Sequence, residues 1–198
     1  MSYILFNKIR YVFYSPIVWI WLKIKGVKCS GNSLWCGFPF ISKTKGSTIV
    51  IGSACRFASK KTANLLGINH RCMISTSNKK STLSIGDNCG FSGVTIWCFD
   101  KISIGNHVRV GANVTIMDGD AHQNDPRAGK DKPVTIEDNV WIGANVIVLK
   151  GATIGRNSLI GAGSVVSGNI PANVIAAGNP CKVVRQLDEN TIKEIEKL

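Results

Sequence analysis

A six-residue repeat runs through the centre of this 198-residue chain and constrains its fold more than any other feature. A large apolar residue, in most units followed by a small one, recurs about every six positions, and a small or β-branched residue stands four positions after most of them. The twelve large residues are Ile85, Phe91, Trp97, Ile104, Val110, Ile116, Ile136, Ile142, Val148, Ile154, Ile160 and Val166. The series is interrupted once, after Ile116.

Three hexads make a coil with three flat sides, about 18 residues long, in which each hexad supplies one short strand. The large residue points inward, and a glycine after it, as in Ile85-Gly86 or Ile142-Gly143, is expected to take the backbone angles of a corner. Successive coils stack about 4.8 Å apart. The sequence therefore predicts an all-β protein, a parallel β-helix. A β-sandwich is the alternative, but a sandwich has no reason to keep a six-residue register over twelve units.

The composition supports a folded, reduced protein. Hydrophobic residues make up 44% of the chain and charged residues 18%, which excludes a disordered chain. Seven cysteines are scattered without a C-x-x-C pair, which argues against a disulfide framework and against a zinc ribbon. We expect a cytoplasmic protein.

The positive charge is concentrated in the N-terminal part of the chain. The formal net charge is +12, and residues 1–86 contain thirteen Lys or Arg and no Asp or Glu, whereas the remainder contains eleven bases and twelve acids. This asymmetry indicates an anionic partner, such as a membrane surface, a nucleic acid or an anionic glycan. Nucleic acid is the least favoured of these, because no base-reading motif follows the basic stretch.

Residues 11–24 are mostly apolar and aromatic, with Lys8 and Arg10 before them and Lys23, Lys25 and Lys28 at their end. The run is shorter than the roughly 20 residues of a membrane span, and no small-residue cleavage site follows it, so we expect no removable signal peptide. Two interpretations stay open. Residues 1–28 form an interfacial helix at the inner face of the cytoplasmic membrane, with Trp19 and Trp21 at headgroup level, or they form a helix packed on the domain or on a neighbouring subunit.

The polar segment 117–133 breaks the repeat and contains His122, one of three histidines in the chain. Segments that leave a rigid scaffold often carry function. Imidazole titrates near neutral pH and suits general-base work, and Asp118, Asp120 and Asp125 all lie within four residues of His122 as candidates to orient its ring. Without the repeat, a solvated loop histidine would be the simpler interpretation.

Three segments carry a resemblance to a known family: Val140 to Gly155, Ile160 to Val166, and Ala177-Gly-Asn-Pro-Cys-Lys-Val-Val-Arg185. Over residues 46–186 the chain resembles the hexapeptide-repeat acyltransferases, and most of all the maltose and galactoside O-acetyltransferases with their polysaccharide-modifying relatives. The resemblance implies a left-handed β-helix, a homotrimer and active sites between subunits. The expected organisation is an N-terminal helical segment 1–45, a β-helix 46–178 with the loop 117–133, and a CoA-contacting strand and capping helix in 179–198.

The resemblance also implies an activity and a site. The expected reaction transfers an acetyl group from acetyl-CoA to a hydroxyl of a sugar or glycan in a ternary complex, without a metal. His122 corresponds to the catalytic base, with Asp120 or Asp118 as its orienting group. The residues expected to line the pantetheine arm or to meet the CoA phosphates are Gly143, Ala144, Ala162, Ser167, Lys182 and Arg185. Lys182 stands where the family can have Arg.

Two other functions remain open. The gamma-class carbonic anhydrases share this fold and bind zinc through three histidines, and this chain has His70, His107 and His122, although their spacing matches that cluster poorly. A non-catalytic β-helix scaffold is the second alternative. The sequence does not identify the acceptor, which ranges from a membrane-linked glycan to a small soluble sugar or an antibiotic hydroxyl.

Overall fold

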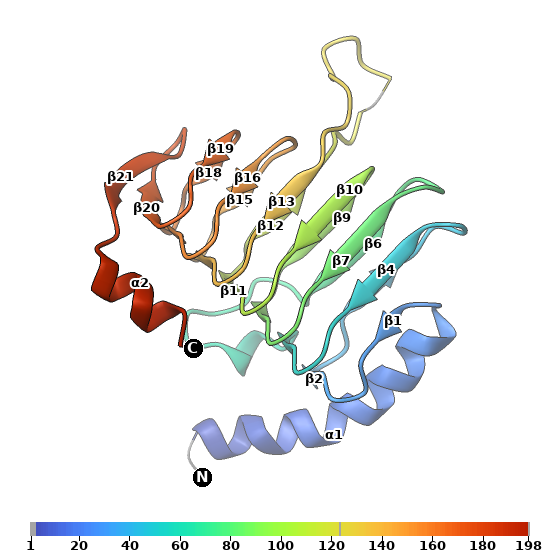
Figure 1. Cartoon of the computed structure of the whole chain (residues 1–198). Helices are drawn as coiled ribbons and strands as arrows, with labels where there is room; N and C mark the ends of the chain where they lie inside the picture. The colour runs from blue at the N-terminus through green and yellow to red at the C-terminus, as the bar shows by residue number, and fades with distance from the viewer. Residues whose placement is uncertain (1–2, 123, 198) are drawn as a thin grey trace.

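The computed structural model describes residues 3–122 and 124–197, with residues 3–8 described by their backbone alone. Its strands, which pair in parallel except for β21, form three sheets that wind round one core, and this confirms the expected left-handed parallel β-helix (Figure 1).

The sheets, called A, B and C here, each take one strand from every coil except the last, which gives β20 and β21 to sheet B and no strand to sheet C. Sheet A contains β1 (Lys28–Cys29), β4 (Thr48–Ile51), β7 (Thr82–Ile85), β10 (Lys101–Ile104), β13 (Val134–Ile136), β16 (Thr153–Ile154) and β19 (Asn169–Ile170). Sheet B contains β2 (Leu34–Cys36), β5 (Arg56–Ala58), β8 (Gly90–Ser92), β11 (Arg109–Ala112), β14 (Trp141–Ile142), β17 (Leu159–Ile160), β20 (Val174–Ala177) and β21 (Lys182–Gln186). Sheet C contains β3 (Phe40–Ser42), β6 (Met73–Thr76), β9 (Thr95–Cys98), β12 (Thr115–Met117), β15 (Ile147–Val148) and β18 (Val165–Val166).

Each coil therefore turns three corners, which we name AB, BC and CA after the sheets they join. A short 3-10 helix, η1 (Lys61–Ala63), lies in a longer BC corner. Helix α1 (Tyr3–Ile24) lies at the N-terminal end of the stack, and helix α2 (Glu189–Ile195) lies beside the outer face of sheet B (Figure 1). Asp188 caps α2 by accepting a hydrogen bond from the Thr191 N–H at 2.8 Å. The expected N-terminal helical segment and short C-terminal helix are both present.

Inward side chains form continuous ladders along the stack. In sheet A the ladder consists of isoleucines that are at most 4% exposed, namely Ile51, Ile85, Ile104, Ile136, Ile154 and Ile170. At the N-terminal end of sheet B, the Trp35 ring stacks on Phe57 with centroids 4.0 Å apart, and Phe57 stacks on Phe91 at 4.9 Å. Full burial of each such side chain stabilises the fold by roughly 1.5–3 kcal/mol.

One hexad was assigned to the wrong residue by the six-residue count. Ile96, not Trp97, faces the core of sheet C, where it pairs with Ile74 on one side and Ile116 on the other. The reason is a shorter BC corner in this coil. The register between β8 and β11 shifts at Ala112, so the corner after Phe91 is one residue shorter than the corner in the next coil.

The corner glycines also act differently from the expectation. Gly86 and Gly143 have no positive φ; instead, a Cβ on Gly86 would lie 2.6 Å from the Gly105 carbonyl oxygen, and one on Gly143 would lie 2.6 Å from the Ala162 nitrogen. These glycines permit close contact between coils. Among the non-glycine residues that the structure describes, the left-handed conformation, with φ between 54° and 61°, falls on Ala54, Asn88, His107, Asn113, Asn139, Asn145, Asn157 and Asn173.

The β-helix begins earlier than residue 46. Lys28 already pairs with Val50, and a complete coil of β1, β2 and β3 precedes β4. Its residues lack the hexapeptide signature, because bulky aromatic side chains such as Trp35 fill this end of the core.

Helix α1 lies across this first coil. Its own Val18 and Leu22 are fully buried against the coil, and its Ser15 hydroxyl accepts a hydrogen bond from the Trp35 backbone N–H at 2.8 Å while it donates to the Tyr11 carbonyl. The packing interpretation of the N-terminal helix is thus correct for one of its faces. Among the described residues, no helix combines the length and apolar character needed to cross a membrane.

Candidate active site

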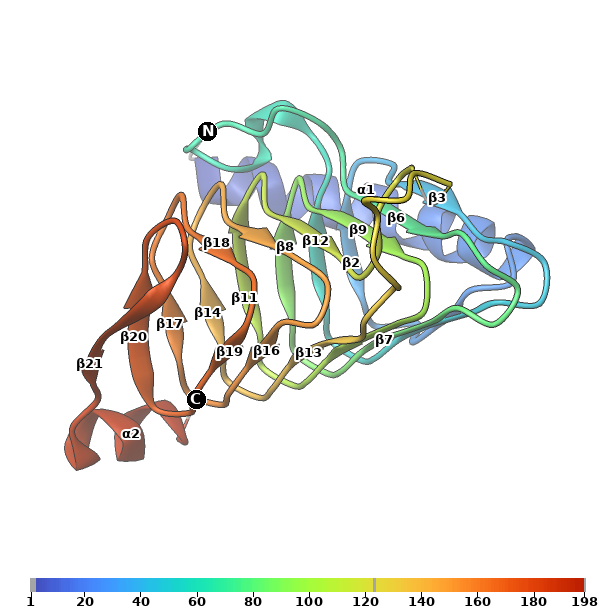
Figure 2. The same cartoon turned by 90° about the horizontal axis from the view of Figure 1, so that it is seen from above.

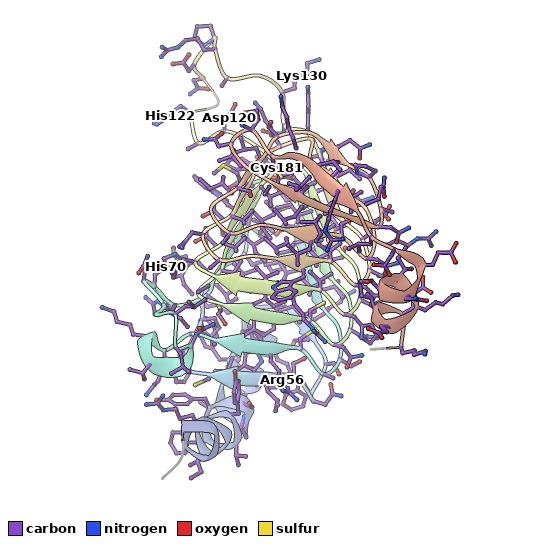
Figure 3. All side chains as sticks on the ribbon, turned by 90° about the vertical axis from the view of Figure 1, so that its left-hand side faces the viewer. Arg56, His70, Asp120, His122, Lys130 and Cys181 are labelled. Atoms are coloured by element: carbon purple, nitrogen blue, oxygen red, sulfur yellow. The ribbon has the colours of Figure 1, made fainter. Side chains whose placement is uncertain are left out.

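The interruption of the repeat is a protruding excursion at one CA corner. It joins β12 to β13 over residues 118–133 and stands clear of the coils in Figure 1. His122 lies on it and is exposed. Figure 3 shows Asp120, His122 and Lys130 together on this excursion, while His70 lies on a separate segment nearer the N-terminal coils.

Asp118 anchors the base of the excursion. Its side chain is fully buried, its Oδ1 accepts from the Phe99 N–H at 2.6 Å, and its Oδ2 accepts from the Asp100 N–H at 2.9 Å. Its carbonyl accepts from the Lys132 N–H at 2.9 Å, so the two ends of the excursion meet there. The carboxylate expected as a partner of His122 is therefore occupied by the backbone of the preceding coil.

Asp120 is engaged by a lysine from the next coil. Its carboxylate forms an ion pair with Lys150, whose Nζ also donates to the Gly129 carbonyl at 3.2 Å. Lys150 thus joins two parts of the excursion to the scaffold. Sequence reasoning left Lys150 out of the site, although a signal was present: the chain returns to the same corner after about 18 residues, and Lys150 stands 18 residues after Lys132.

Asp125 closes a turn within the excursion. Arg127 donates to both its oxygens, from Nε at 2.9 Å and from Nη2 at 2.7 Å, and these bonds hold the pKa of the Asp125 carboxyl below its ordinary value. The Asp125 N–H donates to the His122 carbonyl at 2.9 Å. Within residues 3–122 and 124–197, no hydrogen bond or ion pair joins the His122 ring to a carboxylate, so the ring is open to whatever approaches the excursion.

The residues expected on the donor side lie on two neighbouring corners. Gly143, Ala144 and Ala162 stack at the BC corner, where the Gly163 N–H donates to the Ala144 carbonyl at 2.9 Å. Ser167 lies at the CA corner that follows β18, and it is exposed, as is Ala162. The BC corner precedes the strands of sheet C and the CA corner follows them. The structure therefore divides these four residues between opposite ends of those strands.

The cations Lys182 and Arg185 lie on β21, which pairs antiparallel with β20. Residues three apart on a regular strand face opposite sides, but the register of this pair shifts between Ile175 and Ala176. Lys182 pairs with Ala177 and Arg185 with Ile175, and both of these partners face outward. Because directly paired residues share a face, the bulge brings the two cations to the same outer face.

A pocket of about 300 Å³ lies between the outer face of sheet B and α2. Arg185 contributes to its wall together with Trp141, which is 53% exposed, and with Arg109 and Ile195. Trp141 and Arg109 are directly paired across β14 and β11. Neither residue was singled out from the sequence, although an aromatic residue at an outward strand position is a visible signal.

The three histidines occupy three different corners. His107 takes a left-handed conformation at an AB corner, His70 lies in the long BC corner with its Nδ1 2.9 Å from the Arg71 carbonyl, and His122 lies at a CA corner. Among the described residues, no group of three or more His, Cys, Asp or Glu side chains is placed to hold a metal ion. A single chain therefore does not bring its three histidines together, as the zinc alternative would require.

Comparisons with known proteins agree with this architecture. Residues 133–168 match the family described as bacterial transferase hexapeptide (six repeats). A galactoside O-acetyltransferase of Lactococcus lactis is 50% identical over 97 residues, which cover 46% of each protein, and that of Escherichia coli is 44% identical over 92 residues, which cover 44% of this chain and 45% of the relative. The chain therefore matches about half the length of these curated relatives.

Among solved structures, AntD, an N-acyltransferase from Bacillus cereus in complex with dTDP and 3-hydroxybutyryl-CoA, superposes with a TM-score of 0.67. The match covers 89% of this chain and 92% of AntD at 16% sequence identity, so it establishes the fold alone. Residues 133–168 thus match the bacterial transferase hexapeptide family, and the chain is similar over about half its length to galactoside O-acetyltransferases.

Proposed function

We propose that this protein is an O-acetyltransferase that moves the acetyl group of acetyl-CoA to a hydroxyl of a sugar or glycan, with His122 as general base. The observation that carries the proposal is the position of His122: an exposed imidazole on an excursion that Asp118 anchors to a hexapeptide scaffold. The relatives that match this scaffold at 44–50% identity bear the name galactoside O-acetyltransferase.

His122 performs the proton transfers. Its ring nitrogen accepts the proton of the acceptor hydroxyl while the hydroxyl oxygen forms a bond to the thioester carbonyl carbon. The same imidazolium then returns that proton to the departing sulfur as the carbon–sulfur bond breaks, so the products are an acetate ester and a free thiol. No covalent acyl-enzyme is required.

The donor is bound by the scaffold. The stacked corner at Gly143, Ala144 and Ala162 lacks large side chains and gives an extended pantetheine arm access to the backbone. Lys182 and Arg185, on one outer face, offer charge-assisted hydrogen bonds to the CoA phosphates. Ser167 belongs to this donor site only where a second subunit brings its CA corner near.

We also propose a homotrimer, which the same division of residues supports. His122 and Ser167 leave from CA corners, while Gly143 and Ala162 lie at BC corners. Three copies arranged in a ring bring the CA corner of one subunit toward the BC corner of the next, and each cleft then holds one His122 and one donor track. In that cleft the His122 imidazole, which has no carboxylate partner among the described residues of its own chain, meets its substrate and any group that orients it.

The test compares two identical substitutions. His122→Asn is expected to lower turnover of acetyl-CoA with a galactoside acceptor by about 10²–10⁴-fold, the usual contribution of a general base. His107→Asn is the matched control, because asparagine takes the same left-handed corner conformation at Asn88 and Asn139. Released CoA and acetylated sugar are measured by chromatography and mass spectrometry. Equal turnover in the His122 variant would refute the assigned role, and equal losses in both variants would point to a general structural effect.

A further inference from the structure

Helix α1 is apolar on the face that it turns away from the protein. Its outward side chains recur at helical spacing, and six of them, which we call the outer stripe, are between 45% and 77% exposed: Ile9, Val12, Phe13, Ile17, Ile20 and Ile24. The opposite face already packs on the first coil through the buried Val18 and Leu22. A surface helix normally carries polar residues on its outer face, so the folding of this chain does not account for the outer stripe.

A second segment adds exposed apolar side chains beside the helix. Leu65 and Leu66 follow η1 in the long BC corner and are 84% and 75% exposed. Arg10 Nη1 donates to the Thr62 hydroxyl at 3.0 Å, which holds this corner against α1. Figures 1 and 2 both show the segment beside the N-terminal half of the helix. Two segments distant in sequence therefore form one apolar surface at the N-terminal end of the stack.

Cations border this surface. Lys23 Nζ lies 3.8 Å from the centre of the Trp19 ring, Lys60 Nζ lies 4.8 Å from that of Tyr14, and Lys25 lies near Trp21. The sequence places no Asp or Glu before Asp87. An apolar face with aromatic rings and cations at its edge matches the boundary of an anionic lipid bilayer, where acyl chains meet headgroups.

From this combination we infer that α1, together with Leu65 and Leu66, docks the protein on an anionic membrane surface. The outer stripe enters the acyl-chain boundary, while Lys23, Lys25 and Lys60 meet phosphate groups. Charge complementarity favours this occupant over a second copy of the chain, because another copy would bring thirteen further cations and no acid in residues 1–86. The inference does not depend on the proposed acetyltransferase activity.

The experiment is sedimentation of the full chain with phosphatidylglycerol vesicles and with phosphatidylcholine vesicles. We expect stronger binding to phosphatidylglycerol, weakened by salt. The double substitution Ile17→Glu with Ile20→Glu, at exposed positions, is expected to lower partitioning by about tenfold or more. Val184→Glu on β21, where the side chain is 64% exposed at the far end of the stack, is the matched control and is expected to bind as the unchanged protein does.

Light scattering of the same samples distinguishes the two candidate occupants of the outer stripe, which are a membrane and a second copy of the chain. Vesicle binding that depends on the outer stripe, with an unchanged particle mass, would support the inference. An absence of vesicle binding, or binding that all variants retain, would overturn it. So would a change of particle mass in the stripe variant, since the stripe would then be covered by another copy of the chain. Binding to both lipids without salt dependence would refute the role of the lysines.

Discussion

Replacement of Asp118 by alanine distinguishes a structural carboxylate from a catalytic one. The resemblance makes Asp118 a candidate partner of His122, whereas the structure gives its two oxygens to the Phe99 and Asp100 N–H groups in a fully buried position. Alanine would leave both donors unsatisfied. A hydrogen bond to a charged group contributes about 1.5–3 kcal/mol, and an orphaned buried donor costs about 1–3 kcal/mol.

A loss of about 3 kcal/mol of unfolding free energy is therefore expected for Asp118→Ala. For a chain of this length each kcal/mol shifts the unfolding midpoint by roughly 2–4 °C, so the midpoint should fall by roughly 6–12 °C. Asp120→Ala removes a partly exposed ion pair with Lys150 and should lower it by far less, since such pairs are worth about 0–1 kcal/mol.

Calorimetry at fixed protein concentration measures both variants, because a self-associating protein has a concentration-dependent midpoint. Asp118→Asn is a milder companion, since it keeps one acceptor oxygen and the volume of the side chain. An Asp118→Ala variant with an unchanged midpoint and strongly reduced turnover would refute this reasoning. It would place the carboxylate in catalysis instead.

Three further outcomes are expected. Acetyl-CoA at a hundred times its dissociation constant should stabilise the protein by about 2.7 kcal/mol, and replacing both Lys182 and Arg185 by glutamine should abolish the thermal shift if they bind the phosphates. Gly86→Ala should cost about 1–3 kcal/mol by calorimetry, because its Cβ would lie 2.6 Å from the Gly105 carbonyl oxygen. Burial, with the nearby Asp118 charge second, raises the pKa of the Cys98 thiol to about 12, so alkylation of this cysteine, followed by mass spectrometry, should be negligible at neutral pH and rise only as the pH approaches that value.

The regular part of the fold was predictable because its cause is periodic. Residues such as Ile104, Ile136 and Ile154 face the same core in every coil, so a count of six reveals the architecture. The count failed at Trp97, where one corner is a residue shorter, and before residue 46, where an aromatic core replaces the repeat. Counting in sixes does not detect a corner that is one residue shorter, and it does not detect a coil whose core is filled by aromatic rings.

The candidate site was predictable only as a segment. The break after Ile116 locates the excursion, and His122 is its one imidazole. The partners of the carboxylates could not be predicted from the sequence, because they depend on contacts between coils. Asp118 accepts a hydrogen bond from Phe99 in the preceding coil, and Asp120 forms an ion pair with Lys150 in the next coil. Proximity in sequence favoured a pairing with His122 that neither side chain makes.

The two proposals together set the distance between the membrane and the reacting hydroxyl. Helix α1 lies across the first coil, and the excursion leaves the stack just before β13, four strands beyond β1 in sheet A. At about 4.8 Å per strand, the excursion that carries His122 leaves the stack about 19 Å from the level of β1. A soluble sugar reaches that height freely, whereas a lipid-linked glycan reaches it only through several sugar units. Replacing Ile17 and Ile20 by glutamate should therefore lower turnover of a vesicle-borne glycan while turnover of a soluble galactoside stays the same. The reason is that the outer stripe acts through membrane binding and not through His122.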